Sequence, residues 1–367
     1  MKSLKSSFWN VLVPLFLVYI FLHIGFTTWK LFKVDDTRNG YQNVKDGPLL
    51  LKSGLPYKNN ANKRNKNKIA AKQVPKLKDV GVPKIVNKAK EILISEAHAL
   101  LNATSEDSKF IYVAMINKGY ERLTMNWICN TAQMDNVHNR TLIITMDPTP
   151  CAAIKQQWDN TIKCAQLGLQ TYKKGYDWGK QEYINILTLR ANVMHILTSN
   201  DIPYVLFETD ATWFRDPLPL FRDQLNAEED FDIMVPVKGY DGGSWDTLAF
   251  DPMLVANTNG SKTFMEEMKK RLNEDHTLYD QDVLNQQCSS QHNGLICRQF
   301  DYSEVADGKW YKMDDRERTI PYILNNNFNS GIKNKETKQA LNGFWFLATK
   351  DNQCIIAKVA KFMKKYS

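Results

Sequence analysis

The sequence predicts an α/β fold in which helices cover both faces of a sheet, and three observations support this prediction. From about residue 86 onward, short apolar runs typical of buried strands alternate with segments whose apolar side chains recur at helical spacing. Of the 367 residues, 43% are hydrophobic and 11% aromatic, which is enough for a packed core. The sequence shows no internal repeat. A fully disordered chain, a collagen-like chain and a small disulfide scaffold are therefore excluded.

Each expected element follows from one of these patterns. The runs FIYVAMI, TLIITM and YVLF are short, apolar and rich in β-branched or aromatic residues, so they predict buried strands. The expected elements, in chain order, are a helix over 88–101, a strand over 110–116, a helix over 121–134, a strand over 141–146, a helix over 182–197 and a strand over 204–207. Such alternation favours parallel strands, and ligands of parallel sheets collect at the carboxyl ends of the strands.

The N-terminal region has the pattern of a membrane anchor followed by a stem. Between Lys5 and Lys30 lie 24 residues without a formal charge, and a transmembrane helix needs about 20. The stretch is too long for a typical signal-peptide core and no small-x-small site follows it, which favours a signal anchor over a cleaved signal peptide. The sequence therefore predicts a single-pass type II protein of the Golgi membrane. Its expected parts are a cytosolic tail at 1–7, a transmembrane helix at 8–29, a disordered basic stem at 30–90 and a luminal domain at 91–367.

Sequons and cysteines agree with a luminal domain. Three Asn-x-Ser/Thr sequons begin at Asn102, Asn139 and Asn259, beyond the apolar stretch. All six cysteines also follow it, an even number that permits up to three disulfides among 15 connectivities. The closest pair, Cys288 and Cys297, is suited to closing a small loop. We expect disulfides, and no Cys/His set has zinc-site spacing.

The positive net charge belongs to the predicted tail and stem. The formal charge is +8 overall, but residues 1–57 carry +4 and residues 58–90 carry +10, which leaves −6 for residues 91–367. The acidic remainder shows no basic stripe interleaved with aromatic residues. We therefore expect no nucleic-acid partner.

Two carboxylates directly follow the strand at 204–207. Glu208 and Asp210 emerge at the edge where ligands bind, and their oxygens suit a hard cation, Mn²⁺ or Mg²⁺, that can bridge the two phosphates of a nucleotide sugar. The same triplet is also compatible with two solvated acids at a turn, because acid-x-acid triplets are common. Arg190, on the polar side of the preceding helix, is a candidate for a phosphate contact or a surface salt bridge. A glycosidase is disfavoured, since two acids on one strand end do not straddle a bond at the roughly 5 to 9.5 Å that its chemistry needs.

The residues after these acids carry a family resemblance. ETDATWFRDPLPLF, at 208–221, resembles the D-x-D-v-v-W-l-R-D-P-l-p-y-F signature of the nucleotide-diphospho-sugar transferase domain family, which includes plant rhamnogalacturonan-II xylosyltransferases and arabinosyltransferases. FIYVAMINKGYERLTMNWICN is similar to the family's first strand and helix, and YDQDVLNQ to its D-Q-x-x-x-N segment. LNNNFNSGIKNKETKQALNGFW is similar to its closing H-N-N-W-x-x-G…K…G-l-W block. The four blocks occur in the same order across about residues 108–347.

The resemblance implies a GT-A-like, Rossmann-related mixed sheet flanked by helices, with a metal-dependent sugar-nucleotide site and a retaining outcome. It implies a UDP-sugar donor of the xylose, arabinose or galactose class and a glycan or glycoprotein hydroxyl as acceptor. The resemblance assigns Glu208, Asp210 and Asn325 to the metal, Glu208 and Asp210 also to the donor, and Asp280 and Gln281 to catalysis by orienting the donor sugar and the acceptor. The further donor candidates follow from their positions: Asn117 and Tyr120 come after the first strand, and Arg190 lies on the polar side of the helix that precedes the acid triplet.

Two positions depart from the family pattern. Glu208 stands where the family has Asp, and Asn325 stands where it has His. An amide oxygen carries no charge, so a lower metal affinity is expected at Asn325. The alternative function is therefore a catalytically weakened, membrane-anchored glycan- or nucleotide-binding protein on the same fold.

Overall fold

The computed structural model describes residues 82–158, 161–169, 176, 179–227, 230–239 and 248–366. All of them belong to one compact unit, Lys76–Ser367. The predicted membrane helix at 8–29 and most of the predicted stem lie outside the described residues. Within the described ranges, no helix combines the length and the apolarity that a bilayer crossing requires.

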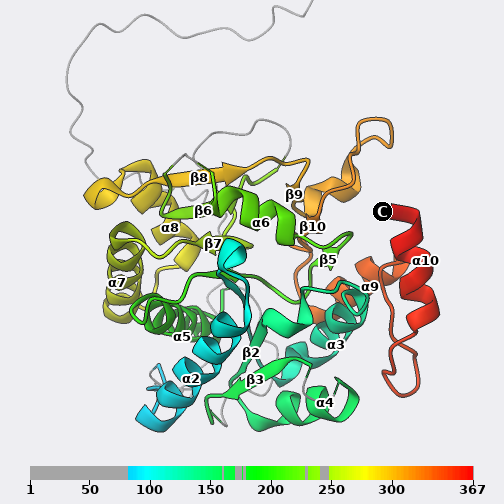
Figure 1. Ribbon diagram of the computed structural model, residues 1–367, viewed down its shortest axis with the longest axis horizontal. Coiled ribbons are helices and arrows are strands. Elements are labelled where there is room, and N and C mark those ends of the chain that lie inside the picture. Colours follow the sequence, from blue (N-terminus) through cyan, green and yellow to red (C-terminus); the bar gives the residue numbers. More distant parts are fainter. Residues whose placement is uncertain are drawn as a thin grey trace, which may run out of the picture. The chain divides into compact units, whose positions relative to one another are not determined.

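The helices and strands are shown in Figure 1. The helices are α2 (Asn87–Ala103), α3 (Glu121–Asn130), α4 (Pro148–Trp158), α5 (Gln181–Thr198), α6 (Leu218–Leu225), α7 (Asn259–Glu274), α8 (Asp280–Ser289), α9 (Ile332–Leu341) and α10 (Ile356–Tyr366). The strands are β1 (Ile111–Ile116), β2 (Thr141–Thr145), β3 (Lys163–Gln166), β4 (Tyr204–Leu206), β5 (Thr212–Trp213), β6 (Ile233–Pro236), β7 (Met253–Val255), β8 (Cys297–Phe300), β9 (Val305–Ala306) and β10 (Ile323–Leu324). Five of the six elements expected from the sequence are confirmed to within two residues at each end.

The main sheet has the strand order β3-β2-β1-β4-β7-β6-β8. β3, β2, β1 and β4 are parallel, as the alternation predicted, and Val113 of β1 pairs with Leu142 of β2 and Leu206 of β4. β7 is antiparallel to both β4 and β6, so the sheet is mixed. The mixed sheet that the family resemblance implied is therefore confirmed, although the apolar run of β7, only three residues long, did not itself indicate the direction of that strand.

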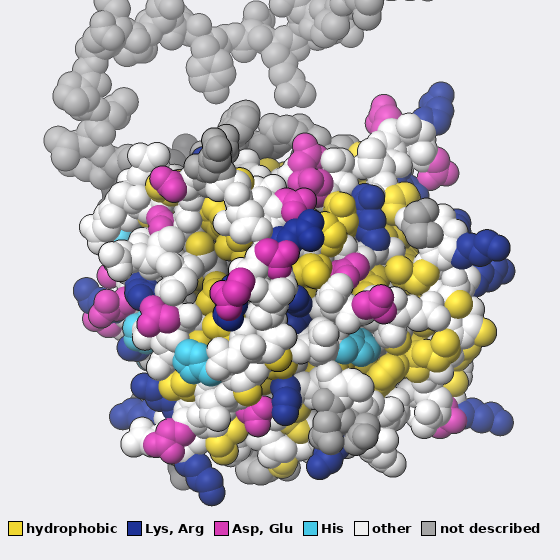
Figure 2. Space-filling model, in the orientation of Figure 1, with side chains coloured by type: hydrophobic (Ala, Val, Ile, Leu, Met, Phe, Trp, Pro, Cys, Tyr) yellow, Lys and Arg dark blue, Asp and Glu magenta, His cyan; other side chains and the backbone are white. Residues whose placement is uncertain are grey.

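Helices cover both faces of this sheet, as predicted. Successive side chains of a strand point to opposite faces, so Ile111 and Val113 of β1 pack with α2, α5 and α7, whereas Tyr112 and Ala114 pack with α3, α4 and α10. Figure 1 shows α2, α5 and α7 gathered on one side and α3 and α4 on the other. On the face shown in Figure 2, acidic and basic side chains of the described residues are interspersed.

One expected helix ends earlier than predicted. The pattern indicated a helix over 121–134, but α3 ends at Asn130. The hydroxyl of Thr131 donates to the carbonyl oxygens of Trp127 and Ile128 and lies 2.9 Å from Nε2 of His138. These local contacts satisfy the last turn and stop the helix.

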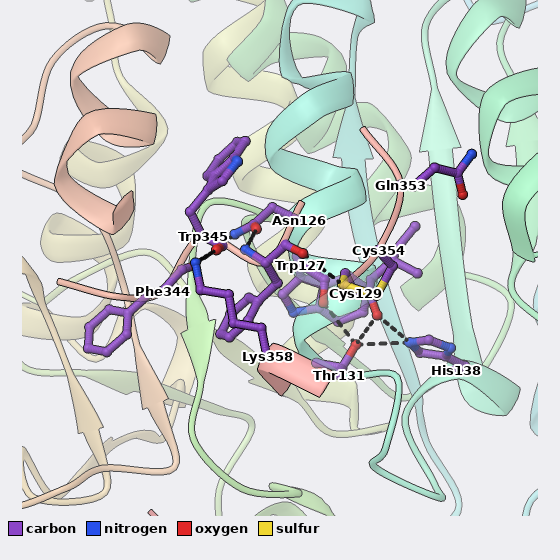
Figure 3. The surroundings of a disulfide bond; sticks show 12 residues. Asn126, Trp127, Cys129, Thr131, His138, Phe344, Trp345, Gln353, Cys354 and Lys358 are labelled. Carbon is purple, nitrogen blue, oxygen red and sulfur yellow. Dashed lines mark hydrogen bonds between the residues drawn. A yellow bond between two sulfur atoms is a disulfide. The ribbon is translucent and has the colours of Figure 1, made fainter. Parts of the chain in front are cut away.

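The C-terminal segment is tied to α3. A disulfide joins Cys129 to Cys354, and the side-chain amide of Asn126 bonds the main chain of Phe344 and Phe346, at 3.0 and 2.6 Å (Figure 3). A small sheet of order β5-β10-β9 pairs the segment after the acid triplet with the chain that leads to α9. The other disulfides are Cys151–Cys164 and the expected Cys288–Cys297. Helix α9 is thereby held beside the carboxyl end of β4.

Candidate active site

A cavity of about 550 Å³ opens at the carboxyl ends of β1 and β4. It adjoins a smaller cleft of about 100 Å³. The predicted residues Tyr120, Arg190, Glu208, Asp280 and Gln281 line the cavity, and Asn117 lines the cleft. The edge of the sheet therefore brings most of the predicted site together, as the position of the acids after a strand indicated.

Arg190 of α5 lies at the centre of the site. Its Nη1 is 2.9 Å from Oε1 of Glu208, and its Nε donates to Oδ2 of Asp280 at 3.0 Å. The guanidinium also lies 4.4 Å from the centroid of the Phe250 ring. Burial would lower the pKa of Arg190, but Asp280 and Glu208 raise it above its usual value. The surface salt bridge considered for Arg190 is thus wrong, because its side chain is only 11% exposed and joins two acids of the site.

Lys335 of α9 binds the second acid of the triplet. Its Nζ forms an ion pair with Oδ2 of Asp210, which is fully buried, and donates to the hydroxyl of Tyr120 at 3.3 Å. Gln339, one turn further along α9, donates to the carbonyl oxygen of Asp210 at 2.6 Å. Burial would lower the pKa of Lys335, yet the charge of Asp210 raises it, so the ammonium stays protonated at neutral pH.

The two acids of the triplet differ in their surroundings. Glu208 lines the cavity, and its side chain is 31% exposed. Burial would raise the pKa of Glu208, but the cations Lys335 and Arg190 lower it. Asp210 lies behind Lys335 and does not line the cavity. Glu208 is therefore accessible to a ligand, whereas Asp210 can contact a ligand only if Lys335 shares the Asp210 carboxylate with that ligand.

Asn325 follows β10 and is buried against a carboxylate that sequence reasoning missed. Its Nδ2 donates to the carbonyl oxygen of Asp251 at 3.1 Å and also to the Asp251 carboxylate. Its Oδ1 is buried without a hydrogen-bond partner. Burial, followed by the charges of Glu208 and Asp210, raises the pKa of Asp251 well above its usual value. The side chain of Asp251 lines the cavity, whereas that of Asn325 lies behind it.

The predicted catalytic pair begins α8. Asp280 is the first helical residue, its Oδ1 accepting from the backbone N–H of Gln281 at 2.8 Å, and the helix N-cap is Tyr279. The side-chain amide of Gln281 donates to the carbonyl oxygen of Leu248. Burial raises the pKa of Asp280, although Arg190 opposes this shift. Contacts on both sides thus fix the orientation of the pair.

The oxygen donors fit the chemistry of a hard cation. Oδ1 of Asp210 and Oδ1 of Asn325 are buried acceptors without a hydrogen-bond partner, and Glu208 adds a carboxylate at the cavity wall. Among the described residues, no three His, Cys, Asp or Glu side chains gather as a metal-binding group. A cation would therefore depend on the amide oxygen of Asn325 and on Lys335 sharing Asp210.

Sequence reasoning missed Lys335, Gln339 and Asp251. Lys335 and Gln339 are four residues apart, so both face Asp210 from one side of α9. The lysine of the closing block was a signal for this helix, but the block contains Lys333, Lys335 and Lys338, and the pattern does not tell which of them enters the site. Asp251 carried no motif.

The sequence pattern of the nucleotide-diphospho-sugar transferase family matches residues 136–339, which is more than half of the chain. The chain therefore belongs to the nucleotide-diphospho-sugar transferase family. The matched stretch contains the acid triplet, the start of α8 and Lys335. No curated protein sequence matches the chain.

Solved structures similar to the chain are glycosyltransferases. The glycosyltransferase GlyE of Streptococcus pneumoniae is 12% identical, with a TM-score of 0.42 over 70% of this chain and 63% of that one. The galactosyltransferase LgtC, solved with donor and acceptor sugar analogues, is 10% identical, with a TM-score of 0.41 over 70% of this chain and 96% of that one. Mouse xyloside xylosyltransferase 1 is 10% identical, with a TM-score of 0.40 over 61% of this chain and 99% of that one. The chain thus spans less than two thirds of the pneumococcal enzyme.

Proposed function

We propose that the protein transfers xylose, arabinose or galactose from a UDP-sugar to a hydroxyl of a glycan or glycoprotein, with Mn²⁺ or Mg²⁺ and with retention of configuration. The observation that carries the proposal is the pairing of two cations of one cavity, Arg190 and Lys335, with three acids: Glu208 and Asp280 line the cavity, and Asp210 lies directly behind Lys335. Fixed charges of both signs at the carboxyl edge of the sheet suit a ligand that combines a diphosphate with a sugar.

The cations and the acids divide the recognition of the donor. The ammonium of Lys335 and the guanidinium of Arg190 neutralise the diphosphate, while Glu208, Asp210 and Asn325 hold the divalent cation. When bound, that cation supplies Lewis-acid stabilisation of the leaving UDP. The cleft lined by Asn117 and Tyr120 takes the uracil and the ribose, because it lies at the end of β1 and adjoins the cavity at Arg190 and Glu208.

Asp280 and Gln281 orient the donor sugar and the acceptor. Both side chains are already fixed, the first by Arg190 and the second by the backbone of Leu248, so orientation costs little at the moment of reaction. The acceptor proton passes to the departing phosphate oxygen in a front-face retaining reaction. That step needs no separate protein base.

The proposed location is the Golgi membrane, with residues 8–29 as the type II anchor and the domain in the lumen. The three disulfides support an oxidising compartment. The asparagines of all three sequons, Asn102, Asn139 and Asn259, are exposed and accessible to a glycan.

A binding protein without turnover is the second candidate, and two observations favour it. Lys335 already pairs with Asp210, and Asn325 directs its Nδ2 rather than its oxygen to Asp251. Both features weaken a metal site. This candidate predicts nucleotide binding without consumption of any nucleotide sugar.

Turnover distinguishes the two candidates. The full-length chain is incubated with Mn²⁺, a mixture of neutral and charged methyl glycosides as acceptors and, in turn, UDP-xylose, UDP-arabinose, UDP-galactose and GDP-mannose, and the nucleotide released in excess of an acceptor-free reaction is measured. The transferase predicts UDP release from one of the UDP-sugars and its loss in Asp280→Asn, while Lys333→Gln, an exposed control on α9, keeps it. UDP binding without release from any UDP-sugar would favour the binding protein.

A further inference from the structure

One aromatic ring at the cavity is exposed in spite of an unfavourable backbone conformation. Phe328 has a φ of 61°, in the left-handed region where a bulky residue is an outlier. Its side chain is 50% exposed and lines the cavity. Core packing does not account for the conformation, since half of the residue lies outside the core. Strain of this kind at a cavity points to a role in binding.

Neighbouring contacts hold the loop around Phe328 in place. Oδ1 of Asn327 accepts from the backbone N–H of Gly308 at 2.7 Å, and a Cβ at Gly308 would lie 2.0 Å from the Asn327 carbonyl oxygen. Nδ2 of Asn329 donates to Oδ1 of Asn326 at 2.9 Å and to the Asn327 carbonyl oxygen at 3.2 Å. The ring is therefore presented from a fixed backbone, which lowers the entropic cost of using it as a binding surface.

Two lysines accompany the ring. Nζ of Lys238 and Nζ of Lys309 each lie 5.8 Å from the centroid of Phe328. Lys238 lines the cavity. The carboxylate of Asp307 accepts a hydrogen bond from the backbone N–H of Lys309 and offsets part of the charge of the Lys309 side chain. Lys238 is therefore the stronger candidate for binding an anionic group beside the Phe328 ring. An aromatic face suits the C–H face of a pyranose, and an ammonium suits an anionic substituent on it.

This place lies away from the nucleotide end of the cavity. The cleft lined by Asn117 and Tyr120 shares Arg190 and Glu208 with the cavity, but neither Phe328 nor Lys238. If the donor places its base in that cleft and its diphosphate beside Arg190 and Lys335, the part of the cavity around Phe328 is free to bind the acceptor.

We propose that Phe328 and Lys238 form the acceptor subsite, and that the sugar it takes is anionic, bearing a carboxylate or a sulfate. The inference rests on the proposed transferase function and names its acceptor class. Phe328 stacks on the sugar ring, and Lys238 binds the charged group.

The test measures glycoside binding to the full-length chain with UDP present, by titration with saturation-transfer NMR. The probes are methyl β-D-glucuronide, methyl β-D-glucoside 6-sulfate and the neutral methyl β-D-glucoside. We expect at least one charged probe to bind about tenfold more tightly than the neutral one. The stronger of the two charged probes tells a uronate from a sulfated acceptor.

Variants separate the two contacts. Lys238→Gln should remove most of the preference for charge, whereas Lys333→Gln, the exposed control, should keep it. Phe328→Gly should lower the affinity for all three probes about tenfold, because the aromatic ring is lost. The melting temperature of this variant should be unchanged or higher, because glycine adopts a positive φ without strain. UDP affinity should be the same in each variant.

Several outcomes would overturn the subsite. The first is that neutral and charged probes bind with equal affinity. The second is that Lys238→Gln keeps the preference for charged probes, as its control Lys333→Gln does. The third is that Phe328→Gly binds every probe as tightly as the parent does. Charged probes that bind in the expected way to a chain that binds no UDP would support the subsite and defeat the transferase proposal instead.

Discussion

Arg190 joins Glu208, at the end of β4, to Asp280, at the start of α8. The proposed metal-and-diphosphate region and the proposed sugar-orienting pair therefore share one buried guanidinium. Its planar fork contacts both acids at once, which a lysine ammonium does not reproduce. The position of the proposed catalytic pair thus depends on the same residue that we propose as a contact of the diphosphate.

Replacing Arg190 should cost both stability and donor binding. Arg190→Ala leaves two acids without their cation, and loss of one partner in such a buried pair costs about 3 to 5 kcal/mol. Arg190→Lys keeps the charge and should lose less. Thermal unfolding and UDP titration check both variants. An Arg190→Ala protein with the parent's melting temperature and UDP affinity would show that the bridge is unimportant.

Lys335 should matter through its charge. Lys335→Met leaves Asp210 buried without its cation, so burial raises the pKa of Asp210 further and UDP loses an ammonium. We expect UDP affinity to fall at least about tenfold, as for removal of a buried charged contact. Lys333→Met, on the exposed side of α9, is the control. Equal affinities of the two variants would contradict the assignment of Lys335 to the diphosphate.

His138 should make the fold sensitive to acid. Burial lowers the pKa of His138 from 6.5 to about 4, although the hydrogen bond to the Ile128 carbonyl oxygen opposes this shift. The unfolded chain binds the proton more tightly, so stability is lost as the pH falls from 6.5 towards 4. This residue should account for about 3 kcal/mol of that loss.

Urea unfolding between pH 4 and 7 measures this effect. His138→Gln should flatten the dependence of the unfolding free energy on pH. His276→Gln, at an exposed histidine, should leave the dependence as it is in the parent. Identical pH profiles for the parent and His138→Gln would refute the prediction.

The disulfides should differ in their contribution to stability. Cys129 and Cys354 are separated by 225 residues, whereas Cys288 and Cys297 are separated by 9. Loop-closure entropy gives about 5 kcal/mol for the first pair and about 3 kcal/mol for the second. Denaturant unfolding of the two double-alanine variants compares them. A smaller loss for the pair that ties the C-terminal segment to α3 would contradict the entropic argument.

The sequence predicted the elements and the acids that follow a strand, because these depend on local patterns. Apolar runs placed β1, β2 and β4, and the position of Glu208 after β4 placed it at the ligand edge. Recognition of the closing block pointed to Asn325, and the polar side of α5 pointed to Arg190.

What the sequence left open depends on contacts between distant segments. Lys335 pairs with Asp210 across 125 positions of the sequence, in a region that the Cys129–Cys354 disulfide and the small β5-β10-β9 sheet also connect, and sequence spacing predicts none of these pairings. Asp251 precedes the antiparallel β7, whose direction its apolar run did not reveal. The partners of Arg190 were likewise hidden, because a polar helix face is compatible with solvent or with a buried ion pair.

The most direct test of the account is calorimetric titration of UDP and GDP into the full-length chain, with and without Mn²⁺. The parent should bind UDP more tightly with Mn²⁺, Asp210→Asn should lose this gain, and Asp282→Asn, at an exposed acid of the same cavity, should keep it. Folded protein that binds neither nucleotide, with or without Mn²⁺, would contradict the proposed donor site.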